Sequence, residues 1–428
     1  MNLLLQKLKK NFYEITFLVI FLIFCTYFYY SFQYILGDGW AYNELFVNYS
    51  AGIIRRGFLG SIFIFFYENY HIQPLLFFSS IFLVLYSTQL ILYYFILKKY
   101  KNNNIYLFIV LSPAIILFNI YDANVYYVKD VFVNLAILFH CYYIIKFQNN
   151  FDKKKYDKFL LLFVLPIIII NLLNHEIQIF FLGAHILLSF YIYDKNKYNI
   201  KNIFYSYSIV LLPFLFLIFN PGSWEKVTLI NDSLKMFGVT VNNQLAGNIN
   251  LAIGGFLKWH FFFQNINSFV KFLICLILTI FIFYLFFDYL INKKILKLNN
   301  RFRNSYLLFY LPSLALFILA LDYGRLINLI LTHLLAFYLI LEIDYIRLKN
   351  LIKKIFNFYI SKYLLFLFFL FYFFMWYLPQ GGGYAGIGQF SENSSIIKNT
   401  LANEMVKIFM IVYDFIDLNI ISLPRIVV

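Results

Sequence analysis

Long runs of hydrophobic residues, separated by short polar stretches, recur along almost the whole chain. Most runs have the length of an α-helix that crosses a bilayer, and none shows the strict alternation of a β-barrel strand. The pattern predicts an all-α fold, a single transmembrane domain over residues 1–428 with about eleven spanning helices (ten to twelve). The expected spans are 12–36, 74–97, 104–121, 131–147, 159–174, 177–193, 203–220, 269–291, 305–321, 326–341 and 362–379.

Composition supports this reading. Of 428 residues, 62% are hydrophobic and 13% are charged, which excludes a soluble domain of this size. The cysteines Cys25, Cys141 and Cys275 all lie inside apolar runs, so neither a disulfide framework nor a thiolate metal site is expected. We expect no metal and no cofactor.

The distribution of charge predicts the orientation of the helices. With a cytoplasmic N-terminus, most of the 35 lysine and arginine residues fall in stretches on the cytoplasmic side. This is the positive-inside rule, and it accounts for the net charge of +15 without any nucleic-acid partner. The abundance of Phe, Tyr, Ile, Asn and Lys suggests an AT-rich bacterial genome, so we expect a multi-pass protein of the bacterial cytoplasmic membrane.

Three segments on the outer side are long. In the first, 37–73, the apolar stretch Phe58–Tyr67 is too short to span and is expected to form an interfacial helix. The second, 221–268, is the largest loop. The third, 380–428, combines a Gly-rich loop with an apolar stretch that we expect to be a C-terminal interfacial helix.

Charged residues gather where apolar runs end on this outer side. Acids, bases and a histidine at one face of a membrane protein favour polar chemistry on substrates reachable from outside the cytoplasm. The residues are Asp38, Arg55, Arg56, Asp122, Lys129, Asp130, His175, Glu176, Asp322 and Arg325.

The first outer segment offers an acid and two arginines. Asp38 lies between two glycines and is either a catalytic carboxylate or an ordinary turn aspartate. Arg55 and Arg56 are adjacent on the acidic side of the membrane, against the charge rule. A guanidinium group can donate two parallel hydrogen bonds to two oxygens of a phosphate. One interpretation is therefore a clamp for the diphosphate of a lipid-linked sugar. Arginines bound to phospholipid headgroups are the other.

Two charged pairs open spans on the outer side. Lys129 and Asp130 are either a local ion pair or part of a substrate site. His175 and Glu176 lie in a very short turn and form a plausible acid/base pair or a contact to sugar hydroxyls. They are not a metalloprotease motif, because Ile179 stands where a second histidine would be needed.

A last turn and three histidines complete the candidates. Asp322 and Arg325 can bridge each other across one helical turn, or Arg325 can hold a second phosphate. The histidines His140, His185 and His333 fall in the middle of spans. They are either neutral imidazoles bonded to neighbouring helices or the proton-carrying groups of a transporter.

Two stretches resemble a known class of proteins. The segment Asp38-Gly39-Trp40 with Tyr49-Ser50-Ala51-Gly52-Ile53-Ile54-Arg55-Arg56-Gly57-Phe58-Leu59-Gly60 is similar to one in bacterial O-antigen and capsular polysaccharide polymerases (Wzy-like). Ala320-Leu321-Asp322-Tyr323-Gly324-Arg325 looks like a second such stretch. The layout also resembles the C-type (GT-C) integral-membrane glycosyltransferases, which place a functional acid in the first outer loop. The chain lacks the acid pair that many of those enzymes have there.

The resemblance implies an enzyme that joins polyprenyl-diphosphate-linked glycan repeat units on the outer face. Asp38 or Glu176 is expected to act as general base with His175 assisting, and Arg55, Arg56 and Arg325 to stabilise the departing diphosphate. Lys129, Asp130 and Asp322 are expected to bind substrate. The expected partners are the lipid-linked donor and acceptor, membrane lipids and a chain-length regulator. The alternatives are a transferase that adds one sugar from a polyprenyl-monophosphate donor, and a flippase or exporter of lipid-linked glycans.

Overall fold

The computed structural model describes a little over half of the chain. Asp38, Arg55, Asp122 and Asp322 lie outside the described residues, as do the expected spans 269–291 and 362–379, most of 305–321, half of 104–121, most of the loop 221–268 and the whole of 380–428. The described residues are 11–34, 42, 44–54, 56–103, 109–112, 114–118, 127–220, 223–237, 296–297, 312–313, 323–343, 347 and 350.

Seven of the expected spans are helical, which confirms the all-α class for this part of the chain. Five helical stretches are long and apolar enough to cross a membrane: Pro74–Lys101, Asp130–Phe147, Lys153–Asn174, Glu176–Lys195 and Lys201–Phe219. Two further apolar helices are α2 (Phe12–Tyr34) and α20 (Tyr323–Ile340).

Several of these stretches are built from consecutive pieces. α5 (Pro74–Leu97) continues into the 3-10 turn η2 (Lys98–Asn103), whereas α8 (Asp130–Phe147) is a single helix. The next stretch joins α9 (Lys153–Phe159), the π-turn η4 (Leu160–Val164) and α10 (Leu165–Asn174). The last two join η5 (Glu176–Phe181) to α11 (Leu182–Lys195), and α12 (Lys201–Ser208) to α13 (Leu211–Phe219).

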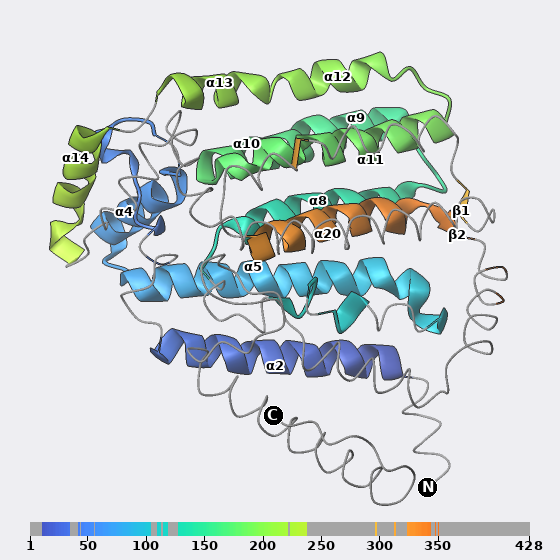
Figure 1. Cartoon of the computed structure of the whole chain (residues 1–428), viewed down its shortest axis with the longest axis horizontal. Helices are drawn as coiled ribbons and strands as arrows, with labels where there is room; N and C mark the ends of the chain where they lie inside the picture. The colour runs from blue at the N-terminus through green and yellow to red at the C-terminus, as the bar shows by residue number, and fades with distance from the viewer. Residues whose placement is uncertain are drawn as a thin grey trace, which may run out of the picture.

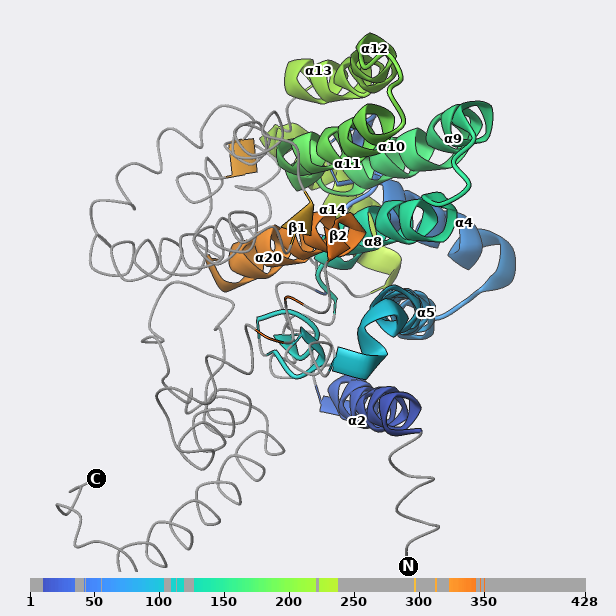
Figure 2. The ribbon, with the colours of Figure 1, turned by 90° about the vertical axis from the view of Figure 1, so that its right-hand side faces the viewer.

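The long helices run side by side with nearly parallel axes (Figure 1). Seen along their length, they stack from α2 through α5 to the pair α8 and α20, then to α10 and α11, and finally to α12 and α13 (Figure 2). α20 is central, because every residue from Gly324 to Ile340 is buried. At the edge, Tyr205 and Phe219 are largely exposed, as expected for residues that face lipid.

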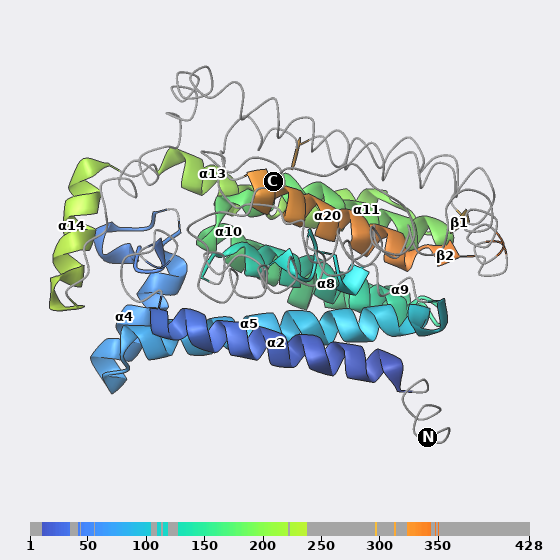
Figure 3. The ribbon, with the colours of Figure 1, turned by 60° about the horizontal axis from the view of Figure 1, so that its bottom comes forward.

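Two short helices lie together at one end of the stack, α4 (Phe58–Tyr70) and α14 (Trp224–Leu234) (Figures 1 and 3). α4 occupies the apolar stretch expected to form a helix in the first outer segment. Its 13 residues rise about 20 Å, less than a bilayer core. The 3-10 turn η1 (Tyr49–Ala51) packs against both helices, and η6 (Lys235–Phe237) follows α14.

Two glycines let α4 approach the segment before it. A Cβ added at Gly60 would lie 2.1 Å from the carbonyl oxygen of Val47, and one added at Gly57 would lie 2.4 Å from the ring of Tyr49. Asn174 at the end of α10 accepts a hydrogen bond from the backbone N–H of Leu59 (3.1 Å), which ties the start of α4 to the stack. These contacts position the chain between residues 44 and 57.

The described strands are two residues long each. β1 (Leu296–Lys297) pairs antiparallel with β2 (Glu342–Ile343), beyond the end of α20 that lies away from α4 and α14.

Candidate functional site

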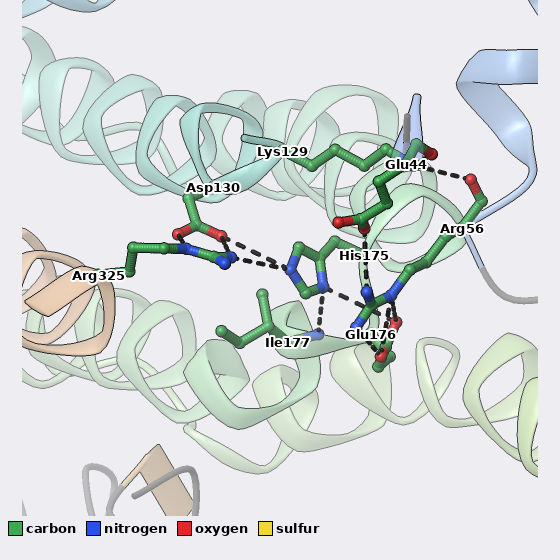
Figure 4. A network of polar contacts seen from close by, with 8 residues as sticks. All are labelled: Glu44, Arg56, Lys129, Asp130, His175, Glu176, Ile177 and Arg325. Carbon is green, nitrogen blue, oxygen red and sulfur yellow. Dashed lines mark hydrogen bonds and ion pairs between the residues drawn. The ribbon is translucent and has the colours of Figure 1, made fainter. Parts of the chain in front are cut away.

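A network of charged side chains occupies the end of the stack that carries α4 and α14 (Figure 4). α8, η5 and α20 all begin there, so acids at the first turns of α8 and η5 meet the positive ends of their helix dipoles. We call these seven residues the end network: Glu44, Arg56, Lys129, Asp130, His175, Glu176 and Arg325.

Arg56 lies at the centre of one half of the end network. Its Nε and Nη2 hold the Glu176 carboxylate side-on, with Nη2 2.6 Å from Oε1 and Nε 3.0 Å from Oε2. Its Nη1 donates to Glu44 Oε1 at 3.0 Å. Burial opposes the charge on Arg56, but the two carboxylates outweigh it and raise its pKa, so the guanidinium stays charged. The backbone is left-handed here, with a φ of 65°.

Lys129 holds both ends of the segment that carries this arginine. Its Nζ donates to the carbonyl oxygen of Arg56 at 2.9 Å and to that of Glu44 at 3.2 Å. The side chain is fully buried, and this burial lowers its pKa to about 8 although Glu44 favours the charged form. The local Lys129–Asp130 ion pair considered from the sequence is not among the described contacts, because Asp130 pairs elsewhere.

Glu44 is the member of the end network that the sequence did not single out. It is buried, which raises the pKa of its carboxyl, but Arg56 and Lys129 more than offset the effect and the net pKa is lowered. Glu44 is therefore an anion inside the protein. The signal that could have found it is its position in the sequence, 12 residues before Arg56 in the same expected outer segment.

Asp130 and Arg325 form the other half of the network. The guanidinium binds the carboxylate in a bidentate manner, with Nε 2.8 Å from Oδ2 and Nη2 2.9 Å from Oδ1. Both side chains are buried, 195 residues apart in sequence. The described acid partner of Arg325 is therefore Asp130 on α8.

His175 stands between the two halves. Its Nδ1 accepts a hydrogen bond from the backbone N–H of Ile177 at 3.4 Å, and its Nε2 lies 3.5 Å from the Nη2 of Arg325, which can only donate. Nε2 lies 3.6 Å from an oxygen of Asp130, and Nδ1 lies 3.7 Å from an oxygen of Glu176. The ring therefore links the buried Asp130–Arg325 pair to the Arg56–Glu176 pair.

Charge balance and exposure limit what the end network can bind. Three cations face three carboxylates, so with a neutral histidine the network carries no net charge. Glu176 and Arg56 are its most exposed side chains, at 20% and 14%, whereas Asp130 reaches 10% and the rest less. A ligand entering here meets the Arg56–Glu176 pair first.

The structure thus brings together most of the residues singled out from the sequence, namely Arg56, Lys129, Asp130, His175, Glu176 and Arg325. Asp38, Arg55, Asp122 and Asp322 lie outside the described residues. No group of three or more histidine, cysteine or carboxylate side chains suited to a metal ion occurs among the described residues.

The histidines in mid-span form a second polar cluster. His140 and His185 are stacked, with their Nδ1 atoms 3.2 Å apart, and the Nε2 of His140 lies 2.8 Å from the hydroxyl of Tyr156. Bonding to neighbouring helices is thereby confirmed for these two. His333 bonds the carbonyl oxygen of Leu329 in its own helix at 2.7 Å.

The cluster has a fixed hydrogen-bond direction. A carbonyl only accepts, so Tyr207 donates to the carbonyl of His185 and must accept from Ser189. Ser189 accepts from Tyr156, which then accepts from the Nε2–H of His140. The Nδ1 of His140 is therefore bare and accepts from His185. The loop of bonds begins and ends on His185 and ties α8, α9, α11 and α12 together.

Fold and site together define a helical protein with stretches apolar enough to cross a membrane, and with a charge-balanced ion-pair network at one end of the stack. No protein-family model, no curated protein and no solved structure matches the chain.

Proposed function

We propose that the protein is a membrane glycosyltransferase that polymerises polyprenyl-diphosphate-linked glycan repeat units on the outer face of the bacterial cytoplasmic membrane. The observation that supports this most is the convergence of Arg56, His175 and Glu176 from separate segments at one end of the stack. Carboxylate and guanidinium side by side suit an acceptor sugar hydroxyl and a charged leaving group.

In the proposed reaction, an acceptor hydroxyl attacks the anomeric carbon of the donor glycan. The new C–O bond forms as the bond to the diphosphate oxygen breaks, and the electron pair leaves with the polyprenyl diphosphate. Glu176 takes the hydroxyl proton, with His175 beside it 3.7 Å away. Arg56 stabilises the departing diphosphate; removing one such stabiliser typically costs about 2.7–4 kcal/mol of transition-state stabilisation.

The other members of the end network receive positioning roles. Arg325 is buried and engaged by Asp130 through two donors, which favours holding His175 over binding a phosphate. Lys129 fixes the segment that presents Arg56. Asp38 is the alternative to Glu176 as general base, and Arg55 and Asp322 keep the roles expected from the sequence, diphosphate ligand and substrate contact.

The test is an assay with purified protein in detergent, given a synthetic polyprenyl-diphosphate-linked repeat unit and no nucleotide. A product ladder whose steps equal one repeat is expected. It should be lost in Glu176→Gln and kept in Glu68→Gln, which alters an exposed acid of α4. A single added sugar that forms only when a polyprenyl-monophosphate-linked sugar is supplied as well would indicate the monophosphate-donor alternative. No new glycosidic bond, with lipid moved across liposomes, would indicate a flippase.

A further inference from the structure

The edge of the Arg56 guanidinium that could bind a phosphate already contacts the carboxylate of Glu176. The parallel Nε–H and Nη2–H bonds that suit a phosphate are directed at the two oxygens of Glu176. Glu44 takes a single donor on the other side, through Nη1. An anion can therefore bind this edge of Arg56 only when Glu176 releases it.

Protonation is the event that weakens this hold. A carboxylate accepts from both N–H groups as an anion, whereas a neutral carboxyl group keeps weaker bonds without the ionic attraction. Glu44 remains on Nη1 and shares the same cation, so Arg56 does not become an uncompensated buried charge. Glu176 is also the most exposed carboxylate of the end network, and Arg56 lies directly behind it.

We propose that Arg56 binds the diphosphate and that the charged carboxylate of Glu176 blocks this binding. When Glu176 takes up a proton, the guanidinium exchanges the carboxylate for the diphosphate leaving group. The inference rests on the proposed function and adds an order of events to it. When the acceptor's proton arrives on Glu176, the Nε–H and Nη2–H donors of Arg56 become available as charge develops on the diphosphate.

Charge is conserved in this exchange. The O–H bond of the acceptor breaks and its proton neutralises Glu176. The C–O bond to the donor's diphosphate breaks, and the pair of electrons gives the diphosphate one further negative charge. The Nε–H and Nη2–H donors of Arg56 then bond two phosphate oxygens in place of the carboxylate oxygens. Glu44 keeps its bond to Nη1 throughout.

The test is the binding of inorganic pyrophosphate to the full-length protein in detergent, by calorimetry. Glu176→Gln removes the competing charge with almost no change of shape, so its affinity should exceed wild type by about tenfold or more. Glu176→Asp keeps the charge on a shorter arm and should fall between the two. Adding Arg56→Gln to Glu176→Gln should abolish the gain.

Several results would overturn the proposal. One is equal affinity in wild type, Glu176→Gln and Glu176→Asp, with melting curves showing that all three are folded. Another is a gain that survives Arg56→Gln. A third is a gain in pyrophosphate affinity that disappears in nanodiscs of phosphatidylglycerol but not of phosphatidylcholine. The Arg56 guanidinium would then bind ordinary lipid headgroups.

The binding test and the polymerisation assay fail independently. If Glu176→Gln binds pyrophosphate more tightly but wild type makes no glycosidic bond, the anion site stands and the proposed function falls. If a ladder forms but no variant gains affinity, the enzyme stands and the exchange on Arg56 falls.

Discussion

The guanidinium of Arg56 embraces the carboxylate of Glu176 across 120 residues of sequence, with its shortest contact at 2.6 Å. The two come from different parts of the fold, Arg56 from the segment before α4 and Glu176 from the turn that opens η5. The pair thus fastens a short, irregular stretch of chain to the end of the helical stack. Lys129 adds to the same attachment through the carbonyl oxygens of Arg56 and Glu44.

Removing the cation of this pair should destabilise the protein. Arg56→Met leaves Glu44 and Glu176 facing each other without a cation between them, and the loss of one partner of a buried pair costs about 3–5 kcal/mol. Lys155→Met is the matched control, because Lys155 pairs with Asp152 at 3.8 Å in an exposed position. It should cost about 1 kcal/mol or less. Denaturant unfolding in detergent measures both, and equal losses would contradict this role for Arg56.

The contact between α4 and the preceding segment makes Gly60 intolerant of any side chain. Gly60→Ala places a methyl group against the Val47 carbonyl, and backbone must move to admit it. We expect a cost of about 1–3 kcal/mol from this overpacking. Glu68→Ala, on the exposed face of the same helix, is the control. Thermal unfolding should separate the two variants, and a Gly60→Ala melting curve like wild type would show that the approach is looser than the structure has it.

The pKa of Lys129 gives stability a characteristic dependence on pH. Its folded value of about 8 lies below the ordinary 10.5, so between these values the unfolded chain binds more protons and stability rises with pH. The rise is complete above 10.5 and absent below 8, and amounts to about 3 kcal/mol. The unfolding free energy of wild type minus that of Lys129→Met should therefore increase between pH 8 and 10.5. A flat or falling difference would refute the burial of a charged amine there.

The loop of hydrogen bonds around His185 should depend on each of its hydroxyl groups. Tyr156→Phe removes the group that lies between His140 and Ser189, and leaves buried polar atoms without their partner. Such a loss costs about 1–3 kcal/mol. Tyr205→Phe, on the largely exposed face of α12, should change little. Unfolding in detergent compares them, and similar stabilities would mean that the bonds of Tyr156 contribute nothing net.

Sequence pattern was sufficient for the helices and insufficient for the pairings. Continuous apolar runs of helix length predicted α5, α8 and α11 within a few residues, because burial in an apolar medium leaves the backbone no other way to satisfy its hydrogen bonds. The breaks near Pro166 and Pro213 were not predicted, although proline removes a helical donor in each case.

The sequence could predict that residues of the end network lie close together, but not which of them bond to one another. Residues at the same end of neighbouring spans must meet, so the proximity of Arg56, Asp130 and Arg325 follows from topology. Which acid meets which base depends on the order in which helices pack, and an apolar run contains no information on that order. For this reason Glu44 was missed, and the contact of Arg325 with Asp130 was not predicted.

The loop that begins and ends on His185 has a consequence for movement. Because its last bond ends on a carbonyl, which only accepts, none of its bonds can be reversed, and one fixed set of donors links α8, α9, α11 and α12. Sliding of one of these helices past another would break bonds of this loop. Arg56 lies outside this loop, in the segment before α4, and its left-handed backbone stores about 1–3 kcal/mol of strain at the link between the helical stack and α4.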